Sequence, residues 1–115
     1  MDFKFTITDK NDYTVIGLEG SLIEIHQADN LLMQIEDLFI QDKIKFILDL
    51  SRLEFINNTG IALLIRLFCK VRKNGGELAL CNLSNTIQQA DEGKKIMKVF
   101  NHFDNEKEAT ALLSQ

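Results

Sequence analysis

ILDLSRLEFINNTG, residues 47–60, is the stretch of sequence that decides the fold. Its start completes a nearly unbroken apolar run over residues 44–50, which is typical of a strand covered on both faces. An apolar pair at residues 55–56 then precedes two asparagines and a threonine. Their side chains can accept hydrogen bonds from the free N–H groups at the start of a helix. The stretch therefore predicts a buried strand that passes through a short polar segment into a helix beginning near residue 57.

The residues that follow predict the rest of this helix and the elements after it. Apolar side chains recur at helical spacing and form one buried stripe: Ile61, Leu64, Ile65, Phe68 and Val71. The helix ends at residues 73–76, Lys-Asn-Gly-Gly, because a basic last turn followed by glycine is a common stop signal. Four further elements are expected: a strand over residues 77–82, a short helix over 85–91, a strand over 96–100 and a last helix over 106–113.

Upstream of the stretch, the sequence predicts a hairpin and then a helix. Apolar and polar residues alternate over residues 3–8, a β-branched strand covers residues 13–18, and Asn11-Asp12 between them suits a tight turn. Apolar residues fall on one helical face over residues 27–41. Strands separated by amphipathic helices indicate crossovers within one sheet. The fold class is therefore α/β, with a mixed, mostly parallel sheet of four to five strands and helices packed against it.

Composition limits the function. The 115 residues suit one domain over residues 1–115, and the net charge of −4 argues against a nucleic-acid binder. The first residues lack an apolar signal segment. The longest apolar stretch, residues 61–69, is far shorter than a membrane-spanning helix and is interrupted by Arg66. We expect a cytoplasmic protein. Cys69 and Cys81 are interpreted as small buried apolar residues, with a disulfide or a reactive thiol as the alternatives.

No catalytic or metal-binding pattern stands out. His26 and His102 are isolated from other strong metal ligands, and no serine lies in a glycine-flanked nucleophile turn. The Gly75-Gly76 pair follows a helix instead of opening one, so it suits a helix end better than a phosphate cradle. We therefore expect a protein that is not an enzyme and that uses no metal or cofactor.

The helix start at Asn57, Asn58 and Thr59 is the place where regulation could act. A helix N-terminus favours negative charge, and a hydroxyl there can carry a phosphate that changes how a protein surface docks. The alternative is that these three side chains only cap the helix.

Residues 47–60, with the Ile61-Ala62-Leu63-Leu64 that follows, resemble the signature of STAS domains, in particular bacterial anti-sigma factor antagonists. The usual pattern is a strand ending in Asp/Asn-Leu-Ser, an apolar pair, and Asp-Ser-Ser/Thr-Gly at the start of the second helix. Residues 19–22 resemble the family's Gly-x-Leu segment, residues 73–78 its helix-to-strand turn and residues 100–113 its tail. The resemblance spans nearly the whole chain and implies a single STAS domain.

In that family a serine/threonine kinase phosphorylates the Ser after the motif Asp, and the unmodified protein binds the anti-sigma kinase. Matched position by position, the Asp falls on Asn57, the acceptor Ser on Asn58, the next hydroxyl on Thr59 and the glycine on Gly60. This chain departs from the pattern at the acceptor, because Asn58 has no hydroxyl. Either the protein stays in an unphosphorylated-like state, or Thr59 is a substitute acceptor.

The resemblance implies a regulator that acts by protein binding. The expected partner is an anti-sigma factor, a serine/threonine kinase of the histidine-kinase-like ATPase fold; the protein itself is a monomer or weak dimer that neither binds nucleic acid nor inserts into a membrane. The expected binding residues are Asn57, Asn58, Thr59, Gly60, Ala62, Arg66, Ser21, Glu24 and His26, the last three of which could equally be plain loop residues. The alternative is a non-phosphorylated STAS subunit of a larger assembly, such as a lipid transporter complex or a stressosome-like scaffold.

Overall fold

The computed structural model describes residues 2–114 and confirms the α/β class. In chain order the elements are β1 (Phe3–Asp9), β2 (Thr14–Leu22), the short 3₁₀ helix η1 (Ile25–Ala28), α1 (Asp29–Ile40), β3 (Lys45–Ile56), α2 (Asn58–Lys73), β4 (Glu77–Cys81), α3 (Asn85–Gln89), α4 (Asp91–Val99), β5 (His102–Phe103) and α5 (Glu106–Leu113). The strands form one sheet in the order β1-β2-β3-β4-β5. Among the strands of residues 2–114, β1 and β2 pair antiparallel and the other three pairs are parallel, so the sheet is mixed and mostly parallel.

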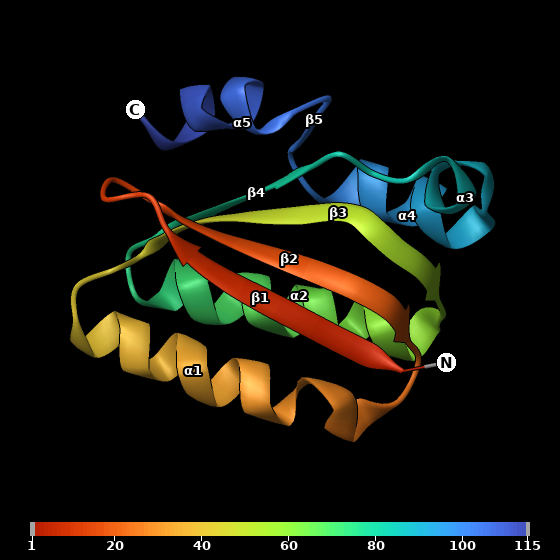
Figure 1. Cartoon of the computed structure of the whole chain (residues 1–115), viewed down its shortest axis with the longest axis horizontal. Coiled ribbons are helices and arrows are strands. Elements are labelled where there is room, and N and C mark those ends of the chain that lie inside the picture. The colour runs from red at the N-terminus through yellow and green to blue at the C-terminus, as the bar shows by residue number, and fades with distance from the viewer. Residues whose placement is uncertain (1, 115) are drawn as a thin grey trace.

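Helices cover both faces of the sheet (Figure 1). The amphipathic α1 and α2 lie on one face, and their apolar stripes pack with the inward side chains of β2, β3 and β4 to form the main core. On the opposite face α5 lies over a smaller cluster that contains Val15, Ile47, Cys81, Ala109 and Leu113. Residues 45–50 of β3 and the strand β4 are therefore covered on both faces, as their nearly continuous apolar sequence predicts.

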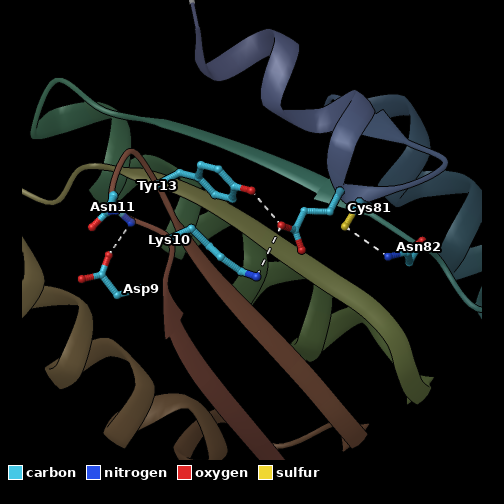
Figure 2. A network of polar contacts seen from close by, with 7 residues as sticks. Asp9, Lys10, Asn11, Tyr13, Cys81 and Asn82 are labelled. Carbon is cyan, nitrogen blue, oxygen red and sulfur yellow. Dashed lines mark hydrogen bonds and ion pairs between the residues drawn. The ribbon is translucent and has the colours of Figure 1, made fainter.

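A polar contact ties α5 to the β1–β2 hairpin (Figure 2). The Tyr13 hydroxyl donates a hydrogen bond to Glu106 Oε2 at 2.7 Å, and Lys10 Nζ lies 4.0 Å from the same oxygen. Hydrogen bonding to the Glu106 carboxylate raises the pKa of Tyr13. The hairpin and the last helix, which are far apart in sequence, are thus joined on one face of the sheet.

The C-terminal third contains one wrong prediction. Residues 96–100 do not form a strand, because α4 covers Asp91–Val99 and the fifth strand is the short pair His102–Phe103. Gly93, Ile96 and Phe100 are buried at helical spacing, and the Phe100 ring packs edge-on against Phe68 with centroids 5.6 Å apart. Helical periodicity, and not the local run of apolar residues, decides this segment.

The second helix is rotated relative to the predicted stripe. Leu63 and Leu67 are buried, whereas Ile65 is 37% exposed. The prediction that Cys69 is buried is wrong, because it lies on the solvent side of α2, opposite the buried Leu67 and Val71. The same prediction is confirmed for Cys81, which lies in the cluster under α5; burial raises the pKa of this thiol to about 12.

The third strand is longer than predicted. It continues to Ile56, because residues 52–56 pair in parallel with the end of β2, where Ser21 aligns with Phe55 and Leu22 with Ile56. Register shifts between Gly17 and Glu19 and between Gly20 and Ser21 accommodate the polar residues of the stretch. This extension carries the strand directly to the start of α2.

Candidate functional site

The candidate site lies where β3 ends and α2 begins, at the carboxyl ends of the parallel strands (Figure 1). Asn57 is the N-cap of α2: its Oδ1 accepts a hydrogen bond from the Gly60 backbone N–H at 3.0 Å. Its Nδ2 donates to the Ile23 carbonyl oxygen at 3.1 Å. The predicted cap is therefore confirmed, and the same side chain also fixes the helix start to the segment after β2.

Gly60 brings the first turn of α2 into backbone contact with β2. A Cβ atom at this position would lie 2.1 Å from the Leu22 carbonyl oxygen and 2.6 Å from Ile56 Cγ1. No side chain fits between these elements, because real Cβ atoms essentially never approach within 3.0 Å of a neighbour. The glycine of the motif is thus explained by close packing.

Asn58 and Thr59 lie on the surface of this fixed turn and are both exposed. The Asn58 Oδ1 atom accepts a hydrogen bond from Lys95 Nζ of α4 at 3.1 Å. The helix N-terminus and the Lys95 ammonium group both create a positive potential at this point. Lys95 is not among the residues predicted from the sequence, because a strand at residues 96–100 was expected where the structure has α4, and the contact joins residues 37 positions apart.

Of the predicted binding residues of α2, Asn58, Ala62 and Arg66 share the exposed side of the helix, whereas Gly60 is buried. Ala62 and Arg66 are exposed on the turns after Asn58. Lys70, farther along, bonds to Glu36 of α1 and so connects the two helices.

Glu24 and His26 are also exposed, in the segment between β2 and α1. The Gln27 side chain accepts hydrogen bonds from the backbone N–H groups of Ile23 and Glu24, at 2.8 and 2.9 Å. His26 Nδ1 lies 3.1 Å from Asp29 Oδ2. These contacts hold the segment in the form of a short 3₁₀ helix, η1, which contacts α2.

The expectation that Ser21 lies in an exposed loop is wrong. It belongs to β2 and is 1% exposed, because the parallel pairing with β3 extends β2 to Leu22. Its hydroxyl has no hydrogen-bond partner among residues 2–114. Ser21 is therefore part of the sheet and cannot contact a docked protein in this conformation.

Two exposed apolar side chains flank Asn57, and neither is among the binding residues predicted from the sequence. Phe55, two residues before Asn57, is 56% exposed, and Ile23, whose carbonyl oxygen bonds to Asn57, is 42% exposed. The signal available in the sequence was the alternation at the end of β3, where the buried Ile56 places the neighbouring Phe55 on the other face. Exposed large apolar groups beside polar ones are typical of protein interaction sites.

Within the described part of the chain, no three His, Cys, Asp or Glu residues are grouped closely enough to hold a metal ion. The helices of residues 2–114 include none with the length and apolar character needed to cross a membrane.

Comparisons with known proteins agree with this architecture. The STAS domain family matches residues 4–109. The anti-sigma F factor antagonist of Paenibacillus polymyxa is 22% identical over 107 residues, which cover 92% of this chain and 91% of that protein. Among known structures, an anti-sigma factor antagonist from Mycobacterium paratuberculosis superposes with a TM-score of 0.75 at 18% identity and covers 99% of this chain and 96% of its own.

A further structural neighbour is the anti-sigma factor antagonist SpoIIAA. Its unphosphorylated form superposes with a TM-score of 0.71 at 22% identity and covers 96% of this chain and 98% of its own. Its phosphorylated form superposes with a TM-score of 0.69 at 21% identity. These likenesses establish a shared fold, and the family match spans most of the sequence. The chain belongs to the STAS domain family.

Proposed function

We propose that this protein is a regulator of the anti-sigma factor antagonist type, which acts by binding a protein partner at the start of α2. The docking surface that we propose consists of Ile23, Phe55, Asn57, Asn58, Thr59, Ala62 and Arg66, with Glu24 and His26 at its edge; Gly60 is buried against β2 and only positions this turn. The observation that carries the proposal is the exposure of Asn58 on a rigid turn whose cap, Asn57, bonds to the backbone of the exposed Ile23 and follows the exposed Phe55 by two residues.

The chemistry of this surface suits a protein partner. An aromatic ring and an arginine are the side chains that most often dominate binding energy at protein interfaces, and Phe55 and Arg66 supply one of each. The turn that carries Asn58 is held by the Asn57 hydrogen bonds and by the close contact at Gly60, so little conformational freedom would be lost on binding. The similarity to anti-sigma factor antagonists supports a partner of the anti-sigma kinase class.

The neutral side chain at Asn58 suits a surface that stays competent for binding. An amide is polar and uncharged, like an unmodified serine, and it cannot be phosphorylated. In this chain the Asn58 oxygen already accepts a hydrogen bond from Lys95, so the cation beside the site is satisfied without a phosphate. We therefore propose that the protein is a permanently unphosphorylated-like antagonist.

Affinity capture with the purified protein tests the proposed partner. The wild type is expected to retain a kinase of the histidine-kinase-like ATPase fold, and Phe55→Ala is expected to weaken that binding by on the order of tenfold, since truncating an interface aromatic costs more than about 1 kcal/mol. Ile40→Ala is the matched control, because Ile40 is 83% exposed at the end of α1 and outside the docking surface. Recovery of a membrane ATPase or of a multisubunit scaffold instead of a kinase would favour the assembly-subunit alternative.

The absence of a usual acceptor leads to a second expected result. Incubated with the captured kinase and ATP, the wild type should keep its mass, whereas Asn58→Ser should gain about 80 Da, the mass of one phosphoryl group. The mass gain expected for Asn58→Ser would show that the kinase is active and recognises the start of α2. A gain in the wild type that disappears in Thr59→Val would instead identify Thr59 as a substitute acceptor and overturn the unphosphorylated-like state.

A further inference from the structure

The first strand is a long, regular edge of the sheet. β1 stands at one end of the strand order and pairs with β2 over seven residues without a register shift. It contains no proline, and the opposite edge, β5, is only two residues long. Monomeric proteins normally protect an exposed edge with prolines, bulges, charges or a short strand. Apart from the charges of Lys4 and Asp9 near its two ends, β1 lacks these devices.

Hydrogen bonds at its two ends define which backbone groups of β1 face outward. The Asp2 carbonyl oxygen accepts from the Ser21 N–H at 3.1 Å, and the Lys10 N–H donates to the Tyr13 carbonyl oxygen at 2.9 Å. Even-numbered residues therefore direct their backbone groups toward β2. Because this direction alternates along an antiparallel strand, the N–H and C=O groups of Phe3, Phe5 and Ile7 point away from the sheet and are available to another strand.

The odd-numbered side chains of β1 line a groove. It has a volume of about 640 Å³ and lies between β1 and the start of α1, with Phe3, Phe5 and Ile7 on one side and Gln27, Asn30 and Gln34 on the other. The three apolar side chains are only half-buried. The outward-facing backbone groups of β1 therefore lie next to an apolar surface, formed by Phe3, Phe5 and Ile7, that the rest of the chain covers only in part.

We propose that this edge binds a second copy of the same chain, in an antiparallel β1–β1 pair centred on Thr6. In this register all seven residues of β1 are paired, since Thr6 is the middle of Phe3–Asp9. Phe5 of each copy faces Ile7 of the other over the groove, and Thr6 faces Thr6 on the exposed face. Aromatic–β-branched and Thr–Thr pairs are favourable cross-strand neighbours.

Charge complementarity selects this register. It places Asp2 of each copy opposite Lys10 of the other, two ion pairs in all. Within residues 2–114 Asp2 makes no ion pair, and the nearest carboxylate oxygen to Lys10 lies 4.0 Å away. Centring the pair on Ile7 would place Lys4 opposite Lys10, which is unfavourable. Centring it on Phe5 would pair only residues 3–7 of the strand.

The geometry leaves the proposed docking surface free on both copies. The start of β1 pairs with the end of β2, which contacts the start of α2. In an antiparallel β1–β1 pair the two α2 starts therefore lie toward opposite ends of the joined edges. A ten-stranded sheet with two separate docking surfaces results, and its formation does not depend on which partner those surfaces bind.

Disulfide trapping tests the register. The background is Cys69→Ser, which removes the exposed thiol, while Cys81 stays buried. Thr6→Cys is expected to give a covalent dimer on oxidation with copper phenanthroline, because a non-hydrogen-bonded antiparallel pair has Cα atoms about 4.5 Å apart, within disulfide range. Thr8→Cys is the matched control: it is also exposed on β1, but the two copies of residue 8 would lie about 13 Å apart along the strands.

Light scattering completes the experiment without relying on a new thiol. The wild type is expected to approach twice its 13.2 kDa mass as its concentration rises toward about 1 mM. Thr6→Lys should stay monomeric while keeping the wild-type circular dichroism spectrum, because like charges would meet at the centre of the pair. The proposal is overturned if the wild type stays monomeric at that concentration. It is also overturned if the Thr6→Cys and Thr8→Cys variants cross-link equally.

Discussion

Asn58→Asp is expected to lower the affinity of the protein for its partner by on the order of 100-fold, about 2.7 kcal/mol. The new carboxylate would lie on the proposed docking surface, and a docked protein would have to desolvate it. The fold should not suffer, because the Lys95 ammonium group and the start of α2 both favour a negative charge there. Titration calorimetry with the captured partner, together with thermal unfolding, separates the two effects.

Asn101→Asp is the control for this change. Asn101 is exposed next to β5, the edge of the sheet opposite β1, so the same change of net charge occurs away from the docking surface. We expect unchanged affinity for this variant. Equal affinity of Asn58→Asp and the wild type would show that the partner does not cover the α2 start, and the proposed docking surface would then be wrong.

Gly60→Ala is expected to destabilise the fold by about 3 kcal/mol or more, which corresponds to a fall in melting temperature on the order of 10 °C. Alanine is normally the better helix residue by about 1 kcal/mol, so intrinsic propensity alone would predict stabilisation. The added methyl group, however, would lie 2.1 Å from the Leu22 carbonyl oxygen. Either the first turn of α2 or the end of β2 must move, and both are backbone. Urea denaturation of the variant and the wild type measures the decrease in the free energy of unfolding.

Gly75→Ala is the matched control for this steric argument. Gly75 has φ of +80°, and no neighbouring atom lies within 4 Å of the point that an added methyl group would occupy. Alanine at this position would therefore lower the free energy of unfolding only because a residue with a Cβ atom disfavours the left-handed backbone, by about 1–2 kcal/mol. The expected order of stability is wild type, then Gly75→Ala, then Gly60→Ala. A Gly60→Ala protein as stable as Gly75→Ala would mean that the α2 start relaxes easily and is not a rigid platform.

The sequence was sufficient to predict the elements that carry strong local signals. The α2 start at Asn57 and its end near Gly75 follow from capping chemistry, and the structure has α2 over Asn58–Lys73. The alternation of apolar and polar residues likewise defined β1. The strand predicted at residues 96–100 failed because five residues with mixed apolar character suit either period. The helical period becomes visible only when Gly93 is included and Gly93, Ile96 and Phe100 are buried together.

The candidate site was predictable only in part. The motif located Asn57, Asn58, Thr59 and Gly60, because their order along the chain is local information. Lys95 could not be found in this way, since its contact with Asn58 depends on how α4 is placed against α2. Ser21 was misplaced for a related reason: whether it lies in a loop or in a strand depends on pairing with Phe55, 34 positions away.

The burial of Cys81 under α5 makes thiol labelling a measure of how often this helix detaches from the sheet. Cys81 is buried in the small cluster under α5, and its raised pKa keeps it protonated at neutral pH, whereas Cys69 is open to solvent. A thiol reagent will therefore modify Cys69 directly and Cys81 only when α5 detaches from the sheet. The ratio of the two labelling rates reports the free energy of that local opening. Cys69 thus serves as the internal standard for the labelling reaction, and Cys81 reports how stably α5 is packed on the sheet.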